Sequence, residues 1–318
     1  MDRVARVSMI LGLFILATGA LVAAPQRLQA EWLTCECPHF YVDALVGEDT
    51  ELCGPDPAFP CRTIQAAIDR IPMVFHRDIV VHVASGVYPG GILISGRTTP
   101  NRSRVRVVGE AEGTIVSGPA GETTGVSVIQ SHNVVLENLD IRGFPDAGVR
   151  VMFSPGARLE SLSLSNNGDG AFLGESDTVV RRGVFNDNLR NGVACQGGWV
   201  AFTGDSAPHA FVGNAGAGIM AAGCHVNLES QVSISGSLHG LLAVHGGEIN
   251  LNLRPDISVY AGTSGSGLTA DCHGMITGFE NSCVGSCTCT AVRYGICEAG
   301  LPSSGGGGRR SPVYVEND

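Results

Sequence analysis

The chain lacks an excess of positive charge. Its 20 basic residues face 30 acidic ones, which gives a formal net charge of −10, and no block of like charges interrupts the sequence. A nucleic-acid-binding protein needs a basic face, so we expect no nucleic-acid partner. After residue 30 the chain also lacks an apolar run of about 18 residues, which a membrane-spanning helix needs. We therefore expect no membrane span in the mature chain.

Aromatic residues are few as well, at 6% of the sequence, whereas glycine is abundant with 44 residues. Val, Ile and Ser recur throughout. This composition is typical of many short strands joined by tight turns, and it predicts an all-β fold.

The first 30 residues, MDRVARVSMILGLFILATGALVAAPQRLQA, have early arginines, then an apolar run, then small residues. This pattern predicts a signal peptide at 1–30. Cleavage is expected after Ala30, with a site near Ala23 or Ala24 as the alternative, and an uncleaved membrane anchor is the other interpretation. Export predicts a secreted protein, extracellular or periplasmic.

Eleven cysteines agree with an oxidising compartment. Four lie near the front, Cys35, Cys37, Cys53 and Cys61, three of them in an amino-terminal segment, 31–60. Four more lie in a carboxyl-terminal segment, 283–300, which we expect to form a Cys-rich cap, and Cys195, Cys224 and Cys272 lie between. Cys53 and Cys61 flank GPDPAFP and are placed to close that loop with a disulfide. The tail 301–318 is flexible by composition.

A repeat runs through the middle of the chain. Its units begin at seven glycines separated by 23, 22, 22, 26, 22 and 27 residues: Gly125, Gly148, Gly170, Gly192, Gly218, Gly240 and Gly267. Each unit holds about three strand patterns. A period of this length without helices predicts a solenoid. We expect a single-domain, right-handed parallel β-helix over 61–282; leucine-rich repeats are the competitor, but their Leu and Asn skeleton is absent.

Two further patterns support this interpretation. Asparagines fall at corresponding turns of successive units, in SNNGDG, FNDNLRNG and VGNAGAG, where we expect them to stack as structural residues. In the segment 61–71, TIQAAIDRI places Ile64, Ala67, Ile68 and Ile71 on one helical stripe. We expect this helix to cover the first coil, whose open sheet edge would otherwise recruit other strands.

The segments FYVDALVGED, PCRTIQAAIDRIP, IVVHVASGVYPGGILISG and RVRVVGEAEGTIVSG resemble the start of the pectin lyase-like β-helix superfamily. The resemblance covers residues 40–118 by motif and 119–280 by repeat pattern. Pectin methylesterases open in a similar way, but their catalytic aspartate pair with glutamine and arginine has no counterpart here. The paired aspartates and Gly-His-Gly of polygalacturonases are absent too. Of the superfamily's activities, the resemblance leaves a calcium-dependent lyase on acidic polysaccharide to test.

Strand phase divides each repeat into inward and outward residues. The expected inward set is Val126, Val128, Val149, Val151, Ala171, Leu173, Val193, Cys195, Ile219, Ala221, Leu241 and Ala243. The expected outward row is Ser127, Arg150, Phe172, Ala194, Met220, Leu242 and Thr269. Cys195 is interpreted as a free, buried, apolar residue.

Four charged residues close to the glycines that open successive units predict a candidate site. With coils about 4.8 Å apart, Asp146, Arg150, Asp169 and Arg190 are expected to share one patch. The two aspartates are candidate Ca²⁺ and substrate ligands, and the arginines are candidate catalytic residues. The alternative is a set of solvated turn aspartates with nearby arginines.

The outward apolar stripe of Phe172, Ala194, Met220 and Leu242 is unusual for an exposed surface. We expect it to be covered by residues 283–300. A homo-oligomer interface and the stacking of a sugar on Phe172 are the alternatives.

Cysteine and histidine recur at one turn of three later units: Cys224-His225, His245 and Cys272-His273. These are transition-metal ligands, so Cys224, His245 and Cys272 form an alternative metal site. The competing interpretation pairs Cys272 with a cysteine of the 283–297 group and leaves the histidines solvated.

Three functions follow from these patterns. The first is a carbohydrate-active enzyme, a lyase on acidic polysaccharide with Ca²⁺ as cofactor. The second is a non-catalytic extracellular or cell-surface β-helix that binds a partner or serves as a structural element. The third is a metal-binding β-helix.

Overall fold

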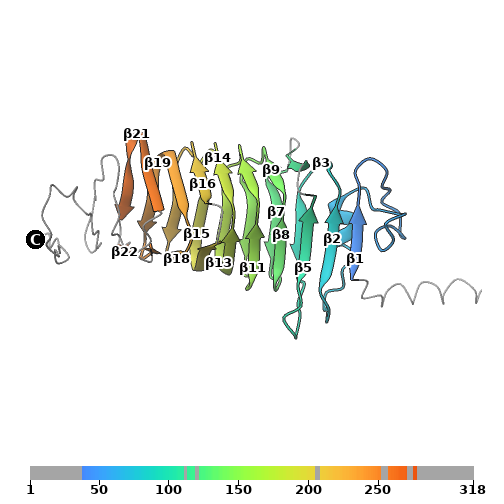
Figure 1. The fold of residues 1–318 in the computed structure, drawn as a ribbon. Coiled ribbons are helices and arrows are strands. Elements are labelled where there is room, and N and C mark those ends of the chain that lie inside the picture. The colour runs from blue at the N-terminus through green and yellow to red at the C-terminus, as the bar shows by residue number, and fades with distance from the viewer. Residues whose placement is uncertain are drawn as a thin grey trace, which may run out of the picture. The chain divides into compact units, whose positions relative to one another are not determined.

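The computed structural model describes residues 38–110, 113–118, 122–204, 208–251, 257–270 and 275–277. In this part of the chain the strands of successive coils lie side by side, in chain order from β1 to β22 (Figure 1). Every strand pairing is parallel and joins one coil to the next. No helix among these residues is long and apolar enough to cross a membrane. The predicted signal peptide, Cys-rich cap and tail lie outside the described residues.

The strands lie on three faces of the coil, here called the first, second and third sheets, and each complete coil contributes one stretch of strand to each face. The first sheet contains β1 (His39–Val42), β2 (Ile79–Val83), β5 (Val105–Gly109), β8 (Val134–Glu137), β11 (Ala157–Glu160), the ends of β13 (Asp169–Arg181) and β15 (Val193–Thr203), β18 (His225–Leu228), β20 (Glu248–Asn250) and β22 (Met275–Thr277). Strand β1 already falls within the segment 31–60.

The second and third sheets follow in the same order around each coil. The second contains β3 (Gly86–Pro89), β6 (Thr114–Ser117), β9 (Asp140–Arg142), β12 (Ser163–Ser165), β14 (Val184–Asn186), β16 (His209–Val212) and the starts of β19 (Val232–Val244) and β21 (Ile257–Ala270). The third contains β4 (Ile92–Ser95), β7 (Thr124–Ile129), β10 (Ala147–Met152), the starts of β13 and β15, β17 (Ala217–Ala222) and the ends of β19 and β21.

The inward set predicted from strand phase is confirmed. All twelve inward residues are buried, because alternate side chains of a strand point into the coil. The outward row is in register from coil to coil: Arg150 pairs with Phe172, Phe172 with Ala194, and so on to Leu242. The β-helix expected from the repeat is therefore the fold of the chain.

The repeating glycines are explained by the approach of neighbouring coils. A Cβ on Gly170 would lie 2.4 Å from the carbonyl oxygen of Gly192, and one on Gly148 would lie 2.8 Å from that of Gly170. Any larger residue would push the coils apart at this corner.

The predicted asparagine stack is present at the turn between the second and third sheets. Asn167, Asn188 and Asn214 are buried. The side-chain oxygen of Asn188 accepts from the Asn167 backbone at 3.0 Å, and that of Asn214 accepts from the Asn188 backbone at 3.2 Å. Their amide nitrogens donate to backbone carbonyls of neighbouring turns. The stack satisfies polar backbone groups that the turn buries.

A second stack, which the sequence reasoning missed, lies at the turn from the third to the first sheet. Ser131, Ser154 and Ser176 are buried and linked in the same way. The Ser131 backbone donates to Ser154 Oγ at 3.1 Å, and the Ser154 backbone donates to Ser176 Oγ at 3.0 Å. Three serines at a spacing of about one coil were the available signal.

The expected helix over 61–71 is shorter in the structure. Helix α2 spans Ile64–Ile68, with the Thr63 side chain accepting from the Ala66 backbone as its N-cap. Helical backbone is disfavoured for the residue before a proline. Because Pro72 follows Ile71, the helix ends before the stripe does. Ile64, Ala67, Ile68 and Ile71 are all buried. That this segment acts as a cap stays a prediction.

Candidate functional site

The charged residues singled out from the sequence form one network, here called the aspartate patch: Asp146, Arg150, Asp169 and Arg190. Asp146 precedes β10, Asp169 begins β13 and Arg190 precedes β15, so three successive coils meet here. Arg150 forms an ion pair with Asp146. The guanidinium of Arg190 bridges the two aspartates, at 2.8 Å from Asp169 Oδ2 and 3.3 Å from Asp146 Oδ1.

Asp169 is the anchor of the aspartate patch, because its side chain is only 6% exposed. Its second oxygen accepts from the backbone and the side-chain amide of Asn191, both at 3.0 Å. The hydrogen bond to Asp169 raises the pKa of Arg190 above its ordinary value. Each aspartate is thus neutralised by a guanidinium, and Ca²⁺ would have to displace that partner to bind.

Phe172 lies beside the aspartate patch, with the Arg150 guanidinium 5.6 Å from the centre of its ring. The expected stripe is in register, but it is not the exposed surface that the sequence predicted. Ala194 is 1% exposed, and Phe172, Met220 and Leu242 are half-buried. The side chain of Ala194 is too short to reach past its longer neighbours in the row, and the stripe is interrupted there. Whether residues 283–300 or a second copy covers it stays a prediction.

The alternative metal site is wrong in its first ligand. Cys224 forms a disulfide with Cys195, so neither sulfur is a free thiolate. The free-cysteine interpretation of Cys195 is wrong for the same reason. Gly223, with φ of 61°, turns the chain so that the next residue, Cys224, points into the coil. His245 is exposed, His225 pairs with Glu248 at 2.9 Å, and Cys272 lies outside the described residues.

The predicted Cys53–Cys61 disulfide is confirmed, with 4.8 Å between the Cα atoms. Within the described ranges, the one group of three side chains close enough to hold a metal ion is Asp49, Cys53 and Cys61. Since both cysteines are in the disulfide, this group offers a single carboxylate and is not a metal centre.

The structure also brings together an arginine cluster on the outer surface of the first sheet: Arg104, Arg106, Arg158 and Arg181. Every one of the chain's 20 basic residues is an arginine. Arg106 pairs with Glu137, whereas Glu160 is shared between Arg158 at 3.9 Å and Arg181 at 3.8 Å. Four guanidinium groups therefore face two glutamates.

The surplus positive charge of the arginine cluster shows in Arg158. Burial lowers the pKa of Arg158, and the neighbouring charges of Arg104 and Arg181 lower it further. In a chain with net charge −10, the arginine cluster is a local patch of positive charge. Sequence reasoning missed this cluster because it followed only the strands that begin at the repeating glycines. Arginines at outward positions of RVRVVG, ARLE and VVRRG were the available signal.

Aromatic side chains lie on the same sheet, at its amino-terminal end. The rings of Tyr41 and His82 stack at 5.1 Å, and those of His39 and His82 at 5.2 Å. Burial lowers the pKa of His82, as do the nearby His39 and Arg106. Strand β2, which carries His82, pairs directly with β5, which carries Arg106. The first sheet thus presents an aromatic platform next to the arginine cluster.

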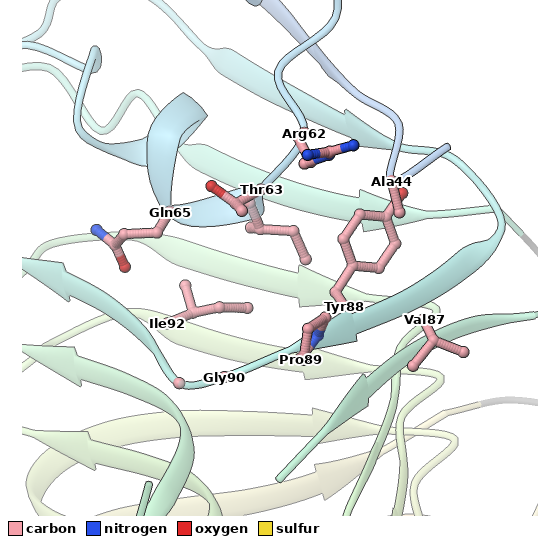
Figure 2. A pocket seen from close by; sticks show the side chains of 11 residues that line it. Ala44, Arg62, Thr63, Gln65, Val87, Tyr88, Pro89, Gly90 and Ile92 are labelled. Carbon is pink, nitrogen blue, oxygen red and sulfur yellow. The ribbon is translucent and has the colours of Figure 1, made fainter. Parts of the chain in front are cut away.

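A pocket of about 410 Å³ lies between helix α2 and strands β3 and β4 (Figure 2). The side chains of Ile64, Tyr88 and Ile92 line it, and Arg62 stands at one end. Tyr88 is buried, and its hydroxyl donates to the Ala84 carbonyl at 2.8 Å. Burial raises the pKa of Tyr88 to about 12, so the hydroxyl stays protonated.

Comparison with known proteins agrees with the architecture. Residues 84–229 match the family model described as "Right handed beta helix region". The chain has the right-handed parallel β-helix fold that the repeat predicted. No curated protein matches the chain.

Three solved structures illustrate the similarity. Escherichia coli YbhC is 14% identical, with a TM-score of 0.41 over 72% of this chain and 76% of that one. A pectin methylesterase from Aspergillus niger is 10% identical, with a TM-score of 0.40 over 79% and 91%. ORF18 of Geobacillus virus E2 is 12% identical, with a TM-score of 0.45 over 81% and 60%.

Proposed function

We propose that this protein binds an acidic polysaccharide along the outer surface of its first sheet. The observation that carries the proposal is the arginine cluster, in which Arg158 has two further arginines as neighbours and only a shared glutamate for compensation. Guanidinium groups bind carboxylates through paired, planar hydrogen bonds. Arg106 and Arg158 lie in one row with Val135 of the intervening coil between them, so a polymer with a carboxylate on each sugar would meet an arginine at every second coil, about 10 Å apart.

Two features support a sugar polymer over a simple anion. The aromatic platform of His39, Tyr41 and His82 offers ring faces on which a sugar can stack. The pectin lyase-like fold also includes proteins that act on acidic polysaccharides. Secretion, which the sequence predicts, would place the protein where such polymers occur.

The test is affinity electrophoresis of the purified protein in gels containing polygalacturonate, alginate or a neutral glucan. We expect retardation by an acidic polymer and none by the glucan, with the effect falling as salt rises. Arg158→Gln and Arg181→Gln should each weaken binding about tenfold, since a charge-assisted hydrogen bond contributes about 1.5 to 3 kcal/mol. Arg102→Gln, an exposed arginine outside the cluster, is the matched control. Equal retardation of all variants would overturn the proposal.

A lyase is the second candidate, favoured by the meeting of Asp146, Arg150, Asp169 and Arg190 in one patch. In this proposal Asp146 and Asp169 bind Ca²⁺ and the substrate, Phe172 stacks a sugar, and Arg150 or Arg190 acts on the proton beside a uronate carboxyl. The assay is release of unsaturated uronides with and without Ca²⁺. Calcium-dependent product that disappears in Arg150→Ala would support the lyase. Binding at the arginine cluster without product would leave a non-catalytic polysaccharide-binding protein.

A further inference from the structure

The pocket beside helix α2 combines an apolar interior with one charged group. Ile64, Tyr88 and Ile92 are buried and supply hydrocarbon and ring surface. Val87, which is 55% exposed, stands at the mouth. A volume of about 410 Å³ is in the range of small-molecule sites. The interior therefore suits an apolar body of moderate size.

The neutral polar groups of the lining are already engaged. The Gln65 side chain accepts from the Leu93 backbone at 2.7 Å and donates to Asp69 at 2.7 Å and to the Leu93 carbonyl at 3.2 Å. The Thr63 hydroxyl donates to Asp49 at 2.9 Å and accepts from the Ala66 backbone. The Tyr88 hydroxyl is taken by Ala84. A bare sugar needs several free partners, and these groups do not offer them.

Arg62 is different, because its guanidinium has no ion pair or hydrogen bond among the residues that the structure describes. Its backbone is nevertheless fixed: the Arg62 N–H donates to Asp49 at 2.8 Å, and the preceding residue is held by the Cys53–Cys61 disulfide. Figure 2 shows the guanidinium near Ala44 and Tyr88, at the opposite end of the pocket from Gly90. The pocket therefore has one charged group available to a ligand, the Arg62 guanidinium, beside its apolar side chains.

Arg62 is the one charged side chain in the lining of the pocket. The carboxylate of Glu122, outside this lining, has an oxygen 3.1 Å from where a Cβ on Gly91 would be. A ligand with one carboxylate would thus be oriented with that group toward Arg62.

We propose that this pocket binds a small hydrophobic monocarboxylate, with its apolar body between Ile64, Tyr88 and Ile92 and its carboxylate on Arg62. The ligand is recognised by two features together, an anionic head and a body without further polar groups. The site is separate from the arginine cluster on the first sheet, so it does not depend on the proposed polysaccharide binding.

The experiment is isothermal titration calorimetry of the full-length protein with cinnamate, using cinnamamide as the neutral probe of the same shape. We expect cinnamate to bind at least tenfold more tightly than the amide. Arg62→Gln should reduce the affinity for cinnamate to that for cinnamamide. Val87→Asp, which places a negative charge at the mouth from an exposed position, should weaken cinnamate more than cinnamamide.

Arg102→Gln is the control for a general change in charge and should bind as the parent does. Thermal unfolding of each variant establishes that it is folded, as expected for exposed positions. Equal binding of the acid and the amide, no binding of either, or an Arg62→Gln variant that keeps the preference would each overturn the proposal.

Discussion

Cys195 and Cys224 are joined by a disulfide between consecutive coils, with 6.1 Å between their Cα atoms. Cys195 lies on β15, and Cys224 follows the end of β17, the strand that pairs with β15 in the third sheet. The bond therefore ties two neighbouring turns of the β-helix at their inner surface, where both sulfurs are buried.

Removing this disulfide should destabilise the protein more than removing the other. The Cys195–Cys224 bond closes a separation of 29 residues and Cys53–Cys61 one of 8. Loop-closure entropy grows with the logarithm of loop length, so the Cys195→Ala/Cys224→Ala variant should lose about 1 kcal/mol more free energy of unfolding than Cys53→Ala/Cys61→Ala. Urea denaturation of both double variants measures this difference, and an equal loss would show that the unfolded chain is not the main contributor.

The asparagine stack should contribute strongly to stability. Asn188→Ala leaves the Asn167 N–H and the Leu164 carbonyl without their buried partners, since both bond to the Asn188 side chain. We expect the free energy of unfolding to fall by about 3 kcal/mol. Asn227→Ala, at a half-buried outward position of β18, is the control and should change it by less than about 0.5 kcal/mol. A small effect at Asn188 would mean that water replaces its bonds.

His209 should make stability depend on pH in mildly acidic solution. The residue is buried, its Nδ1 accepts from the Gly183 backbone, and burial lowers its pKa to about 4. Below pH 6.5 the unfolded chain binds a proton that the folded chain does not, so stability falls between pH 6.5 and 4 and the effect levels off below 4. The loss is at most about 3 kcal/mol.

The measurement is urea denaturation between pH 7 and pH 4. His209→Phe keeps an aromatic ring but does not titrate, and it should show a shallower fall than the parent over this range. His76→Gln, at an exposed position, should follow the parent curve. Parallel curves for the parent and His209→Phe would contradict the assignment.

Asp169 should contribute to the stability of the β-helix where β13 begins, whether or not it binds a ligand. Its buried carboxylate receives Arg190 and both nitrogens of Asn191, so Asp169→Asn turns an amide toward a half-exposed guanidinium that keeps only Asp146 as its charge partner. We expect a loss of about 2 kcal/mol in the free energy of unfolding. Asp177→Asn, on an exposed side chain of the same strand, is the control. If Asp169→Asn left the free energy of unfolding unchanged, the carboxylate would not be needed for stability, and a role in ligand binding would be favoured.

The sequence predicts the fold well because two of its regularities are local. Side chains alternate between inward and outward along a strand, which places Val149 and Leu173 in the core. The glycine that opens each unit marks where neighbouring coils come into contact. Both depend on short stretches of chain and on the repeat itself. The strand register therefore follows from the sequence alone.

The contacts between coils were harder to foresee. Cys224 pairs with Cys195 because Gly223 redirects the chain by one residue, a detail that strand phase does not carry. Ala194 is buried by the longer side chains around it, which periodicity ignores. The arginine cluster combines outward residues of strands far apart in the sequence, from Arg104 to Arg181, and only the stacking of coils shows that they meet.

The glycine corners carry a consequence for how such a chain changes in evolution. The carbonyl oxygens of Gly148, Gly170 and Gly192 each lie against the glycine of the preceding coil. Successive coils therefore make the same glycine–carbonyl contact. Because each coil contacts only its neighbours, and through the same glycine–carbonyl contact, a whole coil can be duplicated or deleted and the contact forms again between the new neighbours. A gain or loss of half a coil leaves a side chain where a carbonyl must sit. The length of this protein is therefore free to vary by whole coils and is resistant to smaller steps.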